Sequence, residues 1–211
     1  MSIDHCDERG VQLPPEPRLL REVTLRLIEE SERNRFDDLL TREHYLKNPT
    51  AVGQVLRYVA EYTGQWLALL VFSSAAFHLK PRDRWLCWPA RLVAQRRHLI
   101  AQNARFLVLP TTGRWPNLAS HVLKLVGDRV AEDWQEHFGH PVLALETFVD
   151  PQRFKGTCYK AAGWEPLGST QGCERDWQDF YRVPLHDKLG EDYRDNLGEW
   201  SNGYRDNRGG C

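Results

Sequence analysis

The chain has 211 residues, of which 41% are hydrophobic and 27% are charged, and its formal net charge is −1. This length allows one sizeable hydrophobic core, and the near-average composition predicts a globular protein. No segment approaches the roughly 18 uninterrupted apolar residues of a membrane span, and the acidic, proline-containing N-terminus lacks the apolar core of a signal peptide. We therefore expect a cytoplasmic protein with no membrane partner.

The first part of the chain predicts an irregular leader followed by strands and a helix. Residues 1–17 contain three closely spaced prolines and form the predicted leader. Polar and apolar residues alternate over 22–28, which predicts a half-buried strand, and 30–45 has the apolar spacing of an amphipathic helix. Two apolar runs, 52–60 and 65–72, are separated by a glycine-containing turn and predict an antiparallel hairpin.

The middle of the chain predicts a basic helix, a strand and a long helix. Residues 83–88 predict a short helix, and 90–102 a longer basic one. The apolar run 105–110 ends in proline, as a buried strand does. From 117 to 138 apolar residues recur at intervals of three and four, which predicts an amphipathic helix that Gly139 ends as a left-handed cap.

The last part of the chain predicts one more strand and helix before a tail. Residues 142–149 form an apolar strand, and a helix ending at Gly163 follows. Beyond Gly172 the chain is rich in Asp, Arg, Asn and Gly. Because so few aliphatic residues cannot offset the entropy of ordering, 184–211 is predicted to be disordered. The folded domain is thus predicted to span 18–183.

The cysteines and histidines give no sign of a metal site. The five cysteines are odd in number and widely scattered, at Cys6, Cys87, Cys158, Cys173 and Cys211. None has Cys-x-x-Cys spacing, and the histidines have no ligand spacing with acids or cysteines. The sequence therefore predicts reduced thiols and no bound metal.

Positive charge is concentrated in one stretch. Between Lys80 and Arg114 there are eight basic residues, and Asp83 is the only acid. Tryptophans interleave with the arginines, and cationic groups beside aromatic faces suit the phosphates and exposed bases of nucleic acids. Alternatively, arginine stems cover helices and the tryptophans fill the core. On the first interpretation a nucleic-acid-binding surface comprises Arg82, Arg84, Arg96, Arg97, Arg105 and Arg114.

The order of the predicted elements resembles the fold of the GCN5-related N-acetyltransferases (GNAT). Residues 159–164, Tyr-Lys-Ala-Ala-Gly-Trp, are similar to the Tyr-x-x-x-Gly-aromatic motif of those enzymes. The resemblance implies an α/β fold with a mixed, largely antiparallel sheet flanked by helices. It also implies that Tyr159 is the acid that protonates the departing coenzyme A thiolate and that Glu146 is the base. The alternative is structural, with Tyr159 packing a helix and Glu146 paired with an arginine.

The turn before the long helix departs from the acyltransferase pattern. Those enzymes usually present a Gly-x-Gly or Gly-x-Ala segment whose backbone amides cradle the pyrophosphate. Here only Gly113 is flexible, and Pro116 removes one amide donor, so a diphosphate approaches the backbone less easily. The amides at the helix start would still suit a phosphate oxygen of another ligand. The cofactor stays unknown, with acyl-CoA as the candidate, and the candidate contacts are Gly113, Asn117 and Ser120.

Several segments carry a second and closer resemblance. They are His44-Tyr45-Leu46, Phe72-Ser73-Ser74-Ala75-Ala76, Pro81-Arg82-Asp83-Arg84-Trp85, Asn103 to Pro110, Asn117 to Ser120, Glu146 to Asp150 and Phe154 to Tyr159. Over residues 21–172 the chain resembles the DruA-type domain of the Druantia system. That family occurs in an anti-phage defence system and in transposase-like proteins, which implies DNA and other proteins of such systems as partners.

Three functions follow from these observations. The first is a DNA-associated module that binds nucleic acid through arginines. The second is an acyl-CoA-dependent N-acyltransferase, and the third is a non-catalytic scaffold for partner proteins. Within a DNA-processing enzyme, Asp83, Glu146 and Asp150 would form a carboxylate cluster that holds Mg²⁺, since two-metal sites need converging acids. Glu146 and Asp150 share a strand face by the two-residue period.

Overall fold

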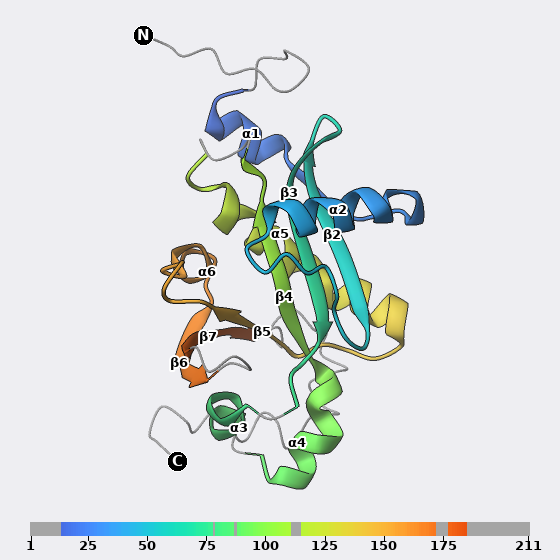
Figure 1. The fold of residues 1–211 in the computed structure, drawn as a ribbon. Coiled ribbons are helices and arrows are strands. Elements are labelled where there is room, and N and C mark those ends of the chain that lie inside the picture. Colours follow the sequence, from blue (N-terminus) through green and yellow to red (C-terminus); the bar gives the residue numbers. More distant parts are fainter. Residues whose placement is uncertain (1–13, 78, 87, 111–114, 172–176, 185–211) are drawn as a thin grey trace.

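The computed structural model describes residues 14–77, 79–86, 88–110, 115–171 and 177–184 (Figure 1). Seven strands in these segments form one sheet in the order β1-β2-β3-β4-β5-β7-β6. Their bounds are β1 (Thr24–Leu27), β2 (Val55–Tyr62), β3 (Gln65–Ser74), β4 (Ile100–Val108), β5 (Ala144–Val149), β6 (Glu165–Gln171) and β7 (Trp177–Pro184). Neighbouring strands are antiparallel except β4 and β5, which are parallel. The predicted mixed, largely antiparallel sheet is confirmed.

Helices flank this sheet on both faces. They are α1 (Glu16–Glu22), α2 (Arg33–Glu43), α3 (Lys80–Leu86), α4 (Ala90–Arg96), α5 (Leu118–Phe138) and α6 (Thr157–Ala161), with 3₁₀ turns η1 (Glu30–Glu32) and η2 (Arg97–Leu99). In the part of the chain that the structure describes, no helix combines the length and the apolar character that crossing a bilayer requires.

The core is divided by strand β3, which is buried on both faces. Side chains of β3 point alternately to the two faces, so Leu70 and Phe72 join the cluster under α5, whereas Leu69 and Val71 pack beneath α2. On α5 the buried residues at intervals of four, Leu118, Val122, Val126, Val130 and Trp134, form the stripe that the sequence predicts. The helix ends at Gly139, whose φ of 74° confirms the predicted left-handed cap.

The predicted boundaries differ from the structure most clearly before β4 and at the N-terminus. The predicted basic helix 90–102 is helical only to Leu99, and β4 begins at Ile100 rather than Arg105. The reason is tertiary pairing, because Ile100 pairs with Ala144 of β5 and Ala101 pairs with Ser74 of β3. At the N-terminus, α1 begins within the predicted leader and buries Leu19 completely. Residues 1–13 of that leader, and nearly all of the predicted tail, lie outside the described residues.

The sheet opens between its two parallel strands. β4 and β5 pair only over Ile100–Asn103 and Ala144–Thr147, although β4 runs on to Val108. At the same level β4 has a bulge, since Phe72 pairs with Asn103 and Val71 pairs with Arg105, which leaves Ala104 between them. The strands therefore diverge beyond Asn103, at the centre of the sheet.

An inserted lobe connects β3 to β4. It comprises residues 79–99, which contain α3, α4 and η2, and is called the α3–α4 lobe below. Figure 1 shows it at the end of the sheet opposite α1. Trp85 of this lobe lies beneath the guanidinium of the buried Arg182 of β7, at 3.2 Å from the ring centroid, so the lobe is docked on the sheet.

Candidate functional site

A cavity of about 460 Å³ lies where β4 and β5 diverge. Its aromatic walls come from the segment after α2, from the two strands and from the region of α6, and comprise Tyr45, Phe106, Phe148, Phe154 and Tyr159. Its polar residues include His44, Asn103, Thr147, Lys155 and Cys158. Volume and lining are those of a small-molecule site, which combines apolar walls with a few convergent polar groups.

The hydroxyl of Tyr159 is fixed at the back of this cavity. The side-chain amide of Asn103 donates to the carbonyls of Val71 and Arg105, so its Oδ1 is left to accept the hydroxyl proton of Tyr159 at 2.8 Å. Thr147 contacts the same hydroxyl at 3.4 Å. Burial raises the pKa of Tyr159, which therefore keeps its proton at neutral pH. A protonated hydroxyl in a cavity is suited to be a hydrogen-bond donor or an acid.

Glu146 lies on the other face of the sheet. It neighbours Thr147 on β5, and successive side chains of a strand point to opposite faces. Its carboxylate accepts a hydrogen bond from the backbone N–H of Ala76 and lies 3.3 Å from Nη1 of Arg82. Glu146 is 1% exposed, and its burial, opposed by Arg82, raises its pKa from 4.5 to about 7. The structure thus does not bring Glu146 together with the hydroxyl of Tyr159.

The three acids of the hypothetical magnesium cluster are also separated. Asp83 and Glu146 both contact Arg82, so a cation already occupies the space between them. Asp150 follows the end of β5, where it accepts a hydrogen bond from the N–H of Gln152 and pairs with Arg153 at 3.1 Å. Across the described segments, no three His, Cys, Asp or Glu side chains are placed to hold a metal ion.

The candidate cofactor contacts at the start of α5 have a protein partner. The backbone N–H of Asn117 donates to one carboxylate oxygen of Glu16 at 2.8 Å, and its side-chain amide donates to the other at 3.2 Å. Ser120 donates to the carbonyl of Asn117. A carboxylate from α1 therefore sits at the positive end of the α5 dipole, where a ligand phosphate would also be favoured. Gly113 lies outside the described residues.

The predicted arginine surface is divided by the structure. Arg82 is 2% exposed, so its assignment to a surface was wrong. Arg105 is half-buried near the segment after α2, where it donates to the carbonyls of Asn48 and Thr50. Its burial lowers its pKa. Arg114 lies outside the described residues.

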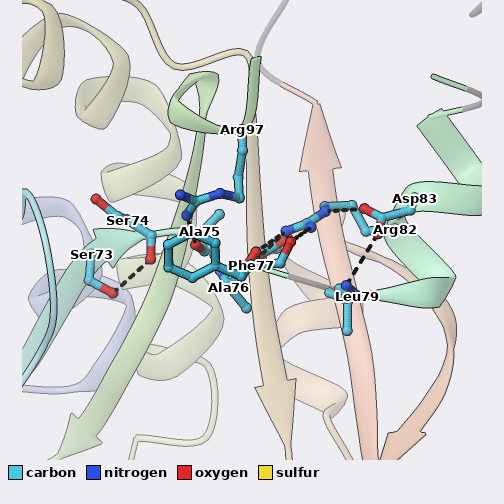
Figure 2. Close-up of polar contacts among 10 residues, drawn as sticks. Ser73, Ser74, Ala75, Ala76, Phe77, Leu79, Arg82, Asp83 and Arg97 are labelled. Atoms are coloured by element: carbon cyan, nitrogen blue, oxygen red, sulfur yellow. Dashed lines mark hydrogen bonds and ion pairs between the residues drawn. The ribbon is translucent and has the colours of Figure 1, made fainter. Parts of the chain in front are cut away.

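The remaining three predicted arginines belong to the α3–α4 lobe. Arg84 is exposed, whereas Arg96 and Arg97 are partly buried. The guanidinium of Arg96 lies 5.7 Å from the ring of Trp88, and that of Arg97 lies 3.8 Å from the ring of Phe77. Phe77, which the sequence reasoning did not single out, is 71% exposed (Figure 2). No periodic pattern marks it, because it stands in an irregular segment between β3 and α3.

A comparison with protein families identifies the chain. The family model described as "Druantia protein DruA" matches residues 15–182. The chain belongs to the DruA family. This match covers every described helix and strand except the end of β7, so the cavity and the α3–α4 lobe are both parts of the DruA domain. No curated protein matches the chain.

Comparison with solved structures shows that this DruA domain has the fold of GNAT acetyltransferases. The aminoglycoside acetyltransferase AAC(6')-Ib in complex with ribostamycin and coenzyme A has a TM-score of 0.56 and 16% identity, with 81% of this chain and 99% of that chain covered. The ribosomal-protein-S18-alanine N-acetyltransferase from Escherichia coli has a TM-score of 0.53 and 12% identity, with 81% and 97% covered. Identities this low establish the fold and not the activity.

Proposed function

We propose that this DruA domain is a DNA-associated module of an anti-phage defence or transposition system and that it binds nucleic acid through the α3–α4 lobe. The observation that carries the proposal is the charge of the lobe. Residues 79–99 include six basic residues and one acid, Asp83, which pairs with the buried Arg82. Of the others, Lys80, Arg84 and Arg91 are exposed.

The position of the lobe supports the same function. The whole chain has a net charge of −1, so the strong positive charge of the lobe is a local feature balanced by acids elsewhere. Local positive charge attracts a polyanion through release of its counterions, whatever the total charge. Since the lobe lies at one end of the sheet, an extended partner can reach it without meeting α1 or α2 (Figure 1).

A titration of labelled single-stranded and duplex DNA over a salt series tests this function. The double variant Arg84→Glu/Arg91→Glu reverses two exposed charges of the lobe. We expect a large loss of affinity and a shallower salt dependence, by roughly 0.7–0.9 in slope for each phosphate contact removed. Arg42→Glu, on the exposed side of α2, is the matched control and should leave binding nearly unchanged. Equal effects of control and lobe variants would refute the proposal.

A second candidate is an acyl-CoA-dependent N-acyltransferase, and the cavity favours it. Where β4 and β5 diverge, the facing strand edges offer backbone N–H and C=O groups for hydrogen bonds. An extended ligand with amide groups, such as the pantetheine arm of coenzyme A, could pair with them. Tyr159 would then donate a proton to the thiolate that leaves. Glu146 could serve as the base only after Arg82 and the lobe moved away from it.

Calorimetric titration with coenzyme A and assay of amine acetylation by acetyl-CoA test this candidate. If it is right, coenzyme A binds and Tyr159→Phe reduces turnover more than binding. Absence of both binding and turnover in a folded protein would exclude it. A folded protein that bound neither DNA nor coenzyme A would favour the third hypothesis, a scaffold for partner proteins.

A further inference from the structure

Phe77 presents an apolar ring to solvent in the middle of a basic region. It is 71% exposed, and it lies between the end of β3 and the start of α3. A single exposed apolar residue needs no explanation by itself. The surroundings of Phe77 need an explanation, because the buried side chains of Arg82 and Glu146 hold the segment that carries it.

The backbone carbonyls of three successive residues, Ala75, Ala76 and Phe77, are held by arginine side chains (Figure 2). Arg97 donates to the carbonyl of Ala75 at 2.6 Å, and Arg82 donates to the carbonyls of Ala76 at 2.8 Å and Phe77 at 3.2 Å. The N–H of Ala76 donates to Glu146. Charge-assisted hydrogen bonds of this kind are stronger than neutral ones, so the loop is held in one conformation.

Arg97, which holds the carbonyl of Ala75, also contacts the ring of Phe77. The guanidinium of Arg97 lies over Phe77, 3.8 Å from its centroid, in a cation–π arrangement (Figure 2). The side chain that fixes the loop therefore also restrains the ring and places a positive charge beside it. A ring that is already ordered loses little entropy when a ligand covers it.

We propose that Phe77 and Arg97 form a stacking platform for an unstacked base of single-stranded DNA. The ring offers a flat apolar face to a base, and Arg97 offers a positive charge to the base or its phosphate. In a duplex the base faces are stacked on one another, so the platform distinguishes single strands from duplexes. Every base has such a face, so the platform confers strand selectivity without sequence selectivity.

This inference rests on the proposed nucleic-acid function, and variants of Phe77 test it separately. Since the ring is mostly exposed, Phe77→Ala should fold normally, as circular dichroism will show. We expect it to weaken binding of a short oligodeoxythymidylate about tenfold, the order of one lost base–aromatic stack, and to change binding of a hairpin duplex less than about twofold. Phe77→Trp should retain single-strand binding, whereas Phe77→Leu should not.

Two further measurements make the test specific. Leu46→Ala removes another exposed apolar side chain, on the segment after α2 and 45% exposed, and should not affect binding. An oligonucleotide with 2-aminopurine reports stacking directly, since its fluorescence should be quenched by the wild type and not by Phe77→Ala. Unchanged single-strand affinity in Phe77→Ala, or equal losses for both DNA forms, overturns the platform alone. A wild type that binds no DNA overturns the platform together with the proposed function.

Discussion

Replacement of the buried Glu146 by glutamine should stabilise the protein near neutral pH. Glutamine has nearly the same shape and keeps one oxygen, which can occupy the place of the Oε1 that accepts from both the N–H of Ala76 and Nη1 of Arg82, but it carries no charge. The pKa of Glu146 is raised because burial disfavours the carboxylate more than Arg82 favours it. The variant resembles the protonated side chain at every pH.

The magnitude follows from the difference between the folded pKa of about 7 and the ordinary value of 4.5. Each pKa unit corresponds to about 1.4 kcal/mol, so the ionisation of Glu146 removes about 3 kcal/mol of unfolding free energy. Between these two pKa values the folded state binds more protons than the unfolded state. The stability that protonation of Glu146 contributes is therefore complete below about pH 4.5, and it is lost as the pH rises through about 7.

Urea denaturation of wild type and Glu146→Gln at several pH values between about 4.5 and 8 measures this effect. The difference between the two curves cancels the other titrating groups. We expect the variant to be more stable by less than about 1 kcal/mol near pH 5 and by about 3 kcal/mol near pH 8. A variant less stable than the wild type near pH 8 would refute the reasoning, because it would show that attraction to Arg82 outweighs the cost of burial.

Three other substitutions test individual contacts, one of them at the cavity and two elsewhere in the fold. Tyr58→Phe deletes a buried hydroxyl that donates to Asp133 at 2.8 Å and should cost about 1.5–3 kcal/mol in chemical denaturation; a loss below about 0.5 would contradict the role of this bond. Gly156→Ala places a Cβ against the ring of Tyr181 at a φ of +64°, and should lower the stability by more than about 2 kcal/mol in the same assay. Glu16→Gln weakens the contact with the backbone N–H of Asn117 at the start of α5 and should lower the stability by about 0.5–1 kcal/mol. If the Glu16 carboxylate competes with coenzyme A for this helix start, the variant should also bind coenzyme A more tightly in a titration. An unchanged affinity would show that it does not compete.

Local patterns were sufficient to predict much of the fold. The stripe on α5 and its end at Gly139 follow from periodicity and backbone chemistry alone, and both are present in the structure. The start of β4 could not be found in this way, because Ile100 and Ala101 continue the helical pattern of the preceding residues. Their strand conformation depends on partners on β3 and β5 that are distant in sequence.

The candidate site residues depend even more strongly on partners that are distant in sequence. Tyr159 could be selected from a short motif, and it does line a cavity. Arg82 was assigned to a surface because it stands in a stretch rich in basic residues, yet it is buried through contact with Glu146, which lies 64 positions away. Nothing in the local sequence indicates such a partner. Phe77 was missed for the related reason that its exposure depends on the two arginines that hold its backbone.

The two carboxylates that bear on an acyltransferase activity have structural partners here. Glu146, which would act as the base, accepts from Ala76 and pairs with Arg82, and so holds the segment that presents Phe77. Glu16 accepts a hydrogen bond from the backbone N–H of Asn117 at the start of α5. The cavity with Tyr159 remains between the diverging strands. Glu146 thereby connects the sheet to the loop that carries Phe77. Acyl transfer with Glu146 as the base would require this carboxylate to leave Ala76 and Arg82, and that change would release the loop.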